Sequence, residues 1–394
     1  MSGTLNSIYN NVSYALYIHS LEMARLQEQA STGSRINRPS DDPSSSYRVL
    51  TLNSQQISLG NHINNLTEAL GTLELSSTVI QEIQSTVTDT KVRLTQVISG
   101  IYNDETRKQL ADGINELLEQ VVSLANTKHM GQYLFGGSDT TSAPYLAERT
   151  NGQITSVTYQ GSLENREIEV APGIRSSVFQ VGQDIFHSDD RSDPLFLGDT
   201  GIKAGTGTSS IQGNIWLTVT GTTGNYTLSI DDGLTTFNTD GTDTNLAITD
   251  STTGKVLYVD TTEITSPGVE LVSVAGTHDI FNSLITIRDI LNNENGLSGT
   301  QLKELHDNSL NMLDEINELL VRAEVTVGTK IGFLDTLKDS LKNLKYNAED
   351  EATLIQEADI AQVAIDLSRR EVLYQMSLSV AGKLMSISLL DYLR

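Results

Sequence analysis

The sequence predicts a mainly α-helical protein with β structure in its middle: a long antiparallel helical coiled-coil rod, β-hairpins beside it and a small inserted β domain. Three observations support this fold class. All six prolines lie at 39–43 or between 144 and 267, so residues 44–143 and 268–394 are free of proline, which costs about 3 kcal/mol inside a helix. Aliphatic residues recur every seven positions after residue 50. The middle of the chain alternates as strands do.

The two ends of the chain are each predicted to form one amphipathic helix. The apolar stripe of the first comprises Ile8, Val12, Met23 and Leu26, and that of the last comprises Leu373, Met376, Val380, Leu384, Ile387 and Leu390. Each stripe covers only part of the other, and isolated helices of this length are marginal in water. We therefore expect these residues to contact neighbouring copies of the chain, with residues 1–48 and 350–394 forming a terminal helical domain.

A polar joint within "STGSRINRPSDDPSSSYRVL", residues 31–50, separates the first helix from the next. Pro39 fixes its own φ and pushes Arg38 toward extended geometry. Asp41 and Asp42 are suited to capping the helix that follows. Arg35 and Arg38 can reach carboxylates within or between copies. Our hypothesis is that this joint sets the register between copies.

The long helices are predicted from heptads. One phase is aliphatic throughout: Leu52, Leu59, Leu66, Leu73, Ile80, Val87 and Leu94. A helix over residues 52–98 is roughly 70 Å long. A shorter helix follows after residue 104, and the heptad pattern returns beyond Pro267. Residues 49–190 and 276–349 are therefore expected to form a helical rod domain with β-hairpins.

The middle of the chain is predicted to be β structure. "QYLFGGSDTTSAPY", "ITSVTYQG" and "REIEVAPG" alternate and are bounded by Gly, Pro and Asn, as hairpins are. Residues 191–275 are rich in Thr, Gly and Asp with short alternating runs such as "NIWLTVTG". We expect this segment to form an outer β domain.

Composition excludes several classes of function. The 394 residues include 26 Lys+Arg and 50 Asp+Glu, a formal charge of −24, so neither nucleic acid nor an anionic membrane is expected as a partner. There is no cysteine, and neither a cleavable signal peptide nor a membrane span is expected. No pattern of catalytic, cofactor-binding or metal-ligating residues emerges, and the six histidines lack metal-ligand spacing. We therefore expect no enzyme activity, no cofactor and no metal.

Three separated motifs then show a resemblance. "ASTGSRINRPSDDPSSSYRVLTLNSQ", "GQYLFGGSDTTSAPY" and "SLLDYLR" resemble segments of the family of flagellar hook-associated protein 3, the distal hook–filament junction protein of the flagellin superfamily. The resemblance covers roughly residues 1–190 and 280–394 and implies a rod of flagellin type. It implies a structural subunit that polymerises with itself and contacts hook-associated protein 1 and filament flagellin. It also implies unfolded type III export, a chaperone at the C-terminal segment and an extracellular place in the bacterial flagellum.

Other functions remain open at this point. Filament flagellin itself is the nearest alternative, although "YLFGG" and "SLLDYL" favour the junction family. A coiled-coil adhesin would need an export signal or anchor. A peptidoglycan hydrolase would need its site within 191–275, and a zymogram of that fragment would detect one.

Overall fold

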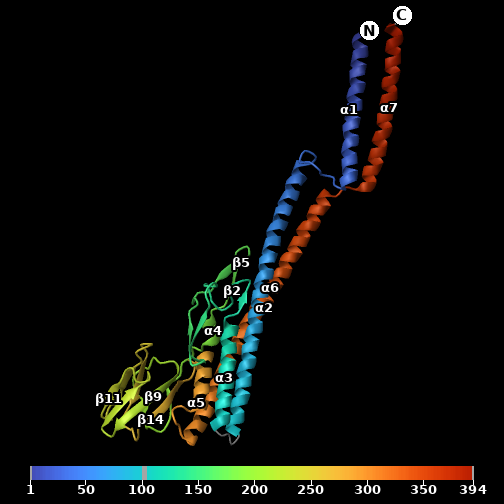
Figure 1. The fold of residues 1–394 in the computed structure, drawn as a ribbon. Coiled ribbons are helices and arrows are strands. Elements are labelled where there is room, and N and C mark those ends of the chain that lie inside the picture. Colours follow the sequence, from blue (N-terminus) through green and yellow to red (C-terminus); the bar gives the residue numbers. More distant parts are fainter. Residues whose placement is uncertain (1, 100–103, 393–394) are drawn as a thin grey trace. The chain divides into compact units, whose positions relative to one another are not determined.

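Seven helices and fourteen short strands make up the part of the chain that the structure, a computed structural model, describes (Figure 1). It describes the backbone of residues 2–99 and 104–392, while the side chains of residues 2–6, 8–9, 97–99 and 384–392 lie outside the description. The helices are α1 (Ser2–Thr32), α2 (Pro43–Ser99), α3 (Asp104–Ala125), α4 (Gly182–Phe186), α5 (Ile280–Asn292), α6 (Gly299–Gln356) and α7 (Ile360–Tyr392).

The chain divides into two compact units. Unit 1 comprises residues 1–65 and 337–394, and unit 2 comprises residues 66–336. Helices α2 and α6 each run through both units. The three-domain division expected from the sequence stays a prediction.

In unit 1, α1 and α7 lie side by side (Figure 1). The first turns of α2 pair with the last turns of α6, where Leu52 packs against Ala348 and Ala352. Arg48 of α2 forms an ion pair with Glu351 of α6. Leu52, Ala348 and Ala352 are buried in this packing, with Ile355 partly buried against them.

In unit 2, α2 and α6 continue to pair in antiparallel fashion. Gln81 Nε2 donates to Glu324 Oε1 at 2.5 Å and Gln84 Nε2 donates to Asn317 Oδ1 at 3.1 Å, while Lys91 forms an ion pair with Asp314. Numbers rise along α2 as they fall along α6, which is the signature of antiparallel helices. The heptad members from Leu66 to Leu94 are all buried, so the repeat marks the core of this unit.

Helix α5 is an element that the heptad analysis did not separate from the long helices. It begins at an N-cap, Asp279, whose side chain accepts a hydrogen bond from Asn282 N, and it ends at Asn293, which adopts the left-handed conformation with φ 50°. It packs against α3, and most of its side chains are buried. Arg288 on α5 donates to Asn115 Oδ1 at 3.1 Å and to Ile154 O at 2.5 Å, which ties α5 to α3 and to a hairpin.

Three two-stranded hairpins follow α3. Their strands are β1 (Lys128–His129) with β2 (Gln132–Tyr133), β3 (Tyr145–Thr150) with β4 (Gln153–Tyr159), and β5 (Glu167–Ala171) with β6 (Ile174–Ser177). Phe135, which follows β2, and Tyr145 of β3 form an aromatic cluster with Phe186 of α4 and Phe281 of α5. Hairpins in this segment match the alternating sequence runs.

The remaining strands form the β insert, residues 195–274. A five-stranded sheet has the order β11-β10-β9-β14-β7 and a three-stranded sheet has the order β12-β13-β8. These strands are β7 (Leu195–Leu197), β8 (Lys203–Ala204), β9 (Gly213–Thr222), β10 (Asn225–Ser229), β11 (Phe237–Thr239), β12 (Leu246–Thr249), β13 (Val256–Asp260) and β14 (Gly268–Val274). One apolar core, including Leu217, Leu228, Leu257 and Val272, joins both sheets. The predicted fold class, mainly α with a small inserted β region, is confirmed.

Candidate functional site: the joint and the terminal helices

The joint occupies residues 33–42, between α1 and α2, and it is hydrogen-bonded to the link between α6 and α7. Arg35 N donates to Gln356 O at 2.7 Å, and Ala358 N donates to Gly33 O at 2.9 Å. Gly33 turns the chain with φ 68°, a conformation that glycine adopts without strain. Backbone hydrogen bonds therefore join the two segments in a short antiparallel β-bridge, in which Ser34 pairs with Glu357.

Asp42 caps the start of α2. Its Oδ1 accepts a hydrogen bond from Ser45 N at 3.0 Å, and Pro43 occupies the first helical position, where its missing N–H and its fixed φ suit a helix start. Hydrogen bonds from Ser45, with a smaller contribution from Arg35, lower the pKa of Asp42. The carboxylate form of Asp42 is thus the one that begins α2.

Asp41 closes the turn around Pro39 instead of capping α2. Its Oδ2 accepts hydrogen bonds from Arg38 N at 2.9 Å and from Asn37 N at 3.1 Å. The hydrogen bond from Arg38 N is the main reason that the pKa of Asp41 is lowered. The two neighbouring aspartates therefore have different structural roles. Asp41 stabilises the turn within the joint, and Asp42 caps the N-terminus of α2.

The two arginines of the joint have partners in their own chain. Arg35 Nη1 lies 3.4 Å from Asp42 Oδ2, and its Nη2 donates to Ile355 O at 3.1 Å. Arg38 Nη2 lies 3.2 Å from Glu28 Oε2. Both guanidinium groups stay largely exposed, and exposed ion pairs contribute about 0–1 kcal/mol. Replacing these partners with carboxylates of a neighbouring chain therefore costs little free energy.

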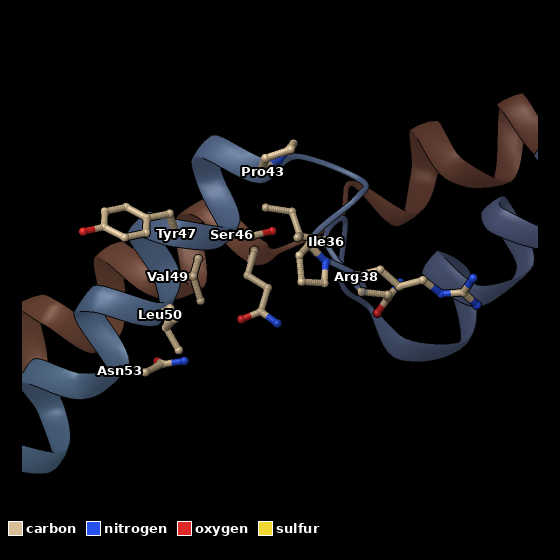
Figure 2. Close-up of a pocket in the computed structure, with 11 residues that line it drawn as sticks. Ile36, Arg38, Pro43, Ser46, Tyr47, Val49, Leu50 and Asn53 are labelled. Atoms are coloured by element: carbon tan, nitrogen blue, oxygen red, sulfur yellow. The ribbon is translucent and has the colours of Figure 1, made fainter.

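An open apolar groove of about 430 Å³ lies beside the joint. Figure 2 shows Tyr47, Val49 and Leu50 of α2 on one side and Ile36 and Arg38 of the joint on the other. Tyr47 is 73% exposed and Leu50 is 67% exposed. Neither residue was among the joint residues expected from the sequence, although both lie within the quoted stretch 31–50.

The predicted contact residues of the terminal helices fall into three groups. Val12, Met23 and Leu26 of α1 are half-buried. Leu373, Met376 and Val380 of α7 are 36%, 61% and 49% exposed. The other four, Ile8, Leu384, Ile387 and Leu390, lie outside the described side chains. Their role in contacts between copies stays a prediction.

The pairing of α1 with α7 buries very little. Among the described side chains of these two helices, Gln29 of α1 and Val363 of α7 are the buried ones. Further exposed apolar side chains accompany the predicted set, namely Tyr14, Tyr17, Leu21, Ile365, Val372 and Leu378. Two helices of 31 and 33 residues thus expose most of their described apolar surface, the kind of surface that marks an interaction site.

Outside this region, Ser273, His278 and Glu315 lie in a line that resembles a hydrolytic triad. His278 Nε2 is 3.2 Å from Ser273 Oγ, and His278 Nδ1 is 2.8 Å from Glu315 Oε2. Ser273 is 3% exposed on β14, so a substrate has no path to its oxygen. The three residues instead connect β14, the turn before α5, and α6.

The described residues hold neither a candidate metal site nor a candidate membrane-spanning helix. They contain no cluster of three or more His, Asp or Glu side chains arranged to hold a metal ion. In the same part of the chain, no helix is both long enough and apolar enough to cross a bilayer.

Comparison with known proteins adds to this geometry. Residues 4–140 match the family model described as the bacterial flagellin N-terminal helical region. Flagellar hook-associated protein 3 of Escherichia coli (strain K12) is 27% identical over 168 residues, which cover 42% of this chain and 51% of the relative. The chain resembles flagellar hook-associated protein 3. The resemblance stated from the sequence motifs is thereby confirmed, as is that to the flagellin superfamily.

Two further comparisons place limits on this resemblance to hook-associated protein 3. Flagellin B of Helicobacter pylori (strain 26695) is 34% identical over 113 residues, covering 28% of this chain and 22% of the relative. The crystal structure of hook-associated protein 3 from Legionella pneumophila superimposes with a TM-score of 0.53 at 17% identity, covering 78% of this chain and 98% of that chain. This likeness concerns the fold. By sequence, the chain spans about half the length of the curated hook-associated relatives it matches.

Proposed function

We propose that this chain is a structural subunit of the bacterial flagellum, an adaptor at the hook–filament junction that polymerises through its terminal helices. The observation that supports this most directly is the exposed apolar surface of α1 and α7, where Gln29 and Val363 are the buried members of the described side chains. The similarity to hook-associated protein 3 indicates which assembly this surface serves.

The proposed mechanism is the packing of many copies around an axis. Exposed residues such as Tyr14, Tyr17 and Met376 bury their apolar area against neighbouring copies. At about 25 cal/mol per Å², a few hundred Å² per contact stabilises the assembly by several kcal/mol. Each copy makes several such contacts, so a stable joint arises from helices that are marginal on their own.

The proposed partners follow from a place at the junction. Other copies of the chain lie beside each subunit, hook-associated protein 1 lies on one axial face and filament flagellin lies on the other. A chaperone holds the C-terminal segment before export, and the assembled chain is extracellular. In this scheme the joint, with Arg35, Arg38, Pro39, Asp41 and Asp42, sets the register between copies.

Filament flagellin is the second candidate, because flagellins match locally with identities up to 34%. The matches to hook-associated protein 3 cover a larger share of the relative, 51% against 22%, which favours the junction. Copy number separates the two candidates. A junction adaptor forms about one ring per flagellum, whereas a filament protein is present in great excess.

A deletion strain tests the proposal. Cells that lack the chain are expected to keep their hooks, to secrete flagellin monomers into the medium and to lose swimming. Electron microscopy of the cells and immunoblotting of the medium measure these outcomes. Normal filaments on the deletion strain contradict the proposal, and bare hooks without hook-associated protein 1 place the chain earlier in assembly.

A further inference from the structure

A second groove lies within unit 2, between α6 and the segment 165–185, with a volume of about 320 Å³. Its α6 wall carries two cations, Arg322 and Lys330, among apolar neighbours such as Ala323 and Val327. The opposite wall includes Gln180. We call it the cation groove. All its lining residues belong to unit 2, whereas the joint and the terminal helices belong to unit 1.

The cations of this groove have no carboxylate partner in the described part of the chain. Lys330 Nζ donates to two neutral acceptors, Ser177 Oγ at 2.9 Å and Gln180 Oε1 at 3.3 Å. Lys330 is half-buried, and burial lowers its pKa. Asp184 also lines the groove but pairs with neither cation. Arg322 is exposed, and none of the ion pairs of the described residues includes it.

The chain carries 50 acidic residues against 26 basic ones. Ten lysines and arginines of the described residues form ion pairs with carboxylates, and Arg322 and Lys330 are not among them. Partial removal of a cation from water without a counter-charge is unfavourable. A carboxylate supplied from outside the chain relieves that cost, so the groove is suited to acidic side chains of a partner.

The same unit displays carboxylates in a complementary pattern. Glu68, Glu82 and Asp89 of α2 are exposed and differ by multiples of seven residues, so they lie along one side of the helix. The buried residues Leu73 and Ile80 lie on the other side. None of the ion pairs of the described residues includes these three carboxylates. We call this row the acidic stripe.

We propose that the cation groove of one copy binds the acidic stripe of a second copy. Arg322 and Lys330 are eight residues apart on α6, about 12 Å along the axis, and Glu82 and Asp89 are seven apart on α2, about 10 Å. Two matched charge pairs therefore form at once. The stripe lies on the side of α2 away from the buried Leu73 and Ile80.

Such a contact joins two different surfaces, so it repeats from copy to copy. A heterologous contact closes into a ring or continues as a helix. The inference rests on the proposed function and deepens it, because it names the surfaces through which neighbouring subunits pair outside the terminal helices.

Cysteine cross-linking tests the pairing without interference from natural thiols, since the full-length chain has no cysteine. One copy carries Thr326→Cys in the groove and the other carries Thr78→Cys beside the stripe; both positions are exposed. Mild oxidation of the concentrated mixture is expected to give the mixed dimer. A copy with Thr222→Cys on the exposed end of β9 replaces the second copy as the matched control and is expected to give none.

Charge reversal identifies the cause of any mixed dimer. Arg322→Glu with Lys330→Glu in the groove copy is expected to lower its yield about tenfold, because like charges then face each other. Glu82→Lys with Asp89→Lys in the other copy is expected to restore it. Circular dichroism verifies that each variant keeps its helices. If the charge reversals leave the yield of mixed dimer unchanged, the pairing is overturned. It is also overturned if the second reversal does not restore the yield that the first one lowers.

The same cysteine pair in assembled flagella separates this inference from the proposed function. Antibody labelling of the junction reports whether the chain is located there. A labelled junction without the mixed cross-link overturns the groove pairing and leaves the proposed function standing. A charge-dependent cross-link of the purified chain, with no labelling at the junction, supports the pairing and overturns the proposed function.

Discussion

The backbone N–H of Arg35 donates a hydrogen bond to the carbonyl oxygen of Gln356 at 2.7 Å. This bond joins the link that follows α1 to the last residue of α6, which lies more than three hundred residues further along the sequence. Because the joint is held by backbone groups here and by the Asp41 carboxylate within its turn, its arginine side chains are not required for its shape.

Replacement of both joint arginines, Arg35→Ala with Arg38→Ala, is therefore expected to leave the helices intact and to impair assembly at the junction. The lost ion pairs are exposed and contribute at most about 1 kcal/mol each. Circular dichroism measures helicity, and motility with filament retention measures assembly. Lys203→Ala with Lys342→Ala removes two exposed cations elsewhere and serves as the control. Normal motility of the arginine variant refutes the role of the joint in register.

The amides of α1 and α7 are expected to exchange faster in the isolated chain than those of α2 and α6. The described side chains of the terminal helices are mostly exposed, whereas residues such as Leu66, Leu73 and Ile80 on α2 are fully buried. Helices without a buried face open more easily. Hydrogen–deuterium exchange followed by mass spectrometry measures the difference. Equal protection of the terminal and long helices contradicts assembly through exposed ends.

Glu270→Gln is expected to stabilise the β insert at neutral pH. Glu270 is buried on β14, its Oε1 accepts hydrogen bonds from Thr200 N and Oγ1, and its Oε2 has no partner among the described residues. Burial raises the pKa of Glu270, so ionisation at neutral pH costs stability. We expect a gain on the order of 1 kcal/mol in the free energy of unfolding. Denaturation monitored at the single tryptophan, Trp216 on β9, measures it.

The pH dependence of that gain has a definite sign. A carboxyl group whose folded pKa is raised contributes stability below its unfolded pKa of about 4.3 and loses it as pH rises through the folded pKa. The advantage of the Glu270→Gln variant over the natural chain should therefore grow from acidic to neutral pH. A constant difference across this range rules out the ionisation of Glu270 as the cause.

Glu315→Gln is expected to act in the opposite direction. Burial acts to raise the pKa of Glu315, but hydrogen bonds from the His278 ring and from Gly276 N outweigh it and lower the pKa. The carboxylate therefore contributes stability above about pH 4.3 that is lost as pH falls through the folded pKa. We expect the variant to lose about 2 kcal/mol at neutral pH, with the deficit shrinking in acid. Equal stability at neutral pH contradicts a structural role for the His278–Glu315 pair.

Sequence periodicity was sufficient to predict the long helices. The residues from Leu66 to Leu94 at seven-residue intervals are all buried, because a helix that packs along one side buries the same phase of its repeat at every turn. The hairpins and the β insert were likewise predicted from alternation, since strand side chains point to opposite faces in turn. Helix α5 was missed as a separate element: the residues that bound it, Asp279 and Asn293, are ordinary polar residues until a structure shows their capping geometry.

The sequence by itself determined the helical and β regions, the polar joint and the apolar stripes of the ends, because each is a local pattern of residue types. Only the tertiary structure decided that Asp42 caps α2 while Asp41 closes the turn, and that Lys330 faces neutral acceptors. Such pairings depend on which distant segments meet. The amino-acid sequence alone does not specify these pairings, because a hydrogen bond or a missing counter-ion depends on where the residues lie in three dimensions.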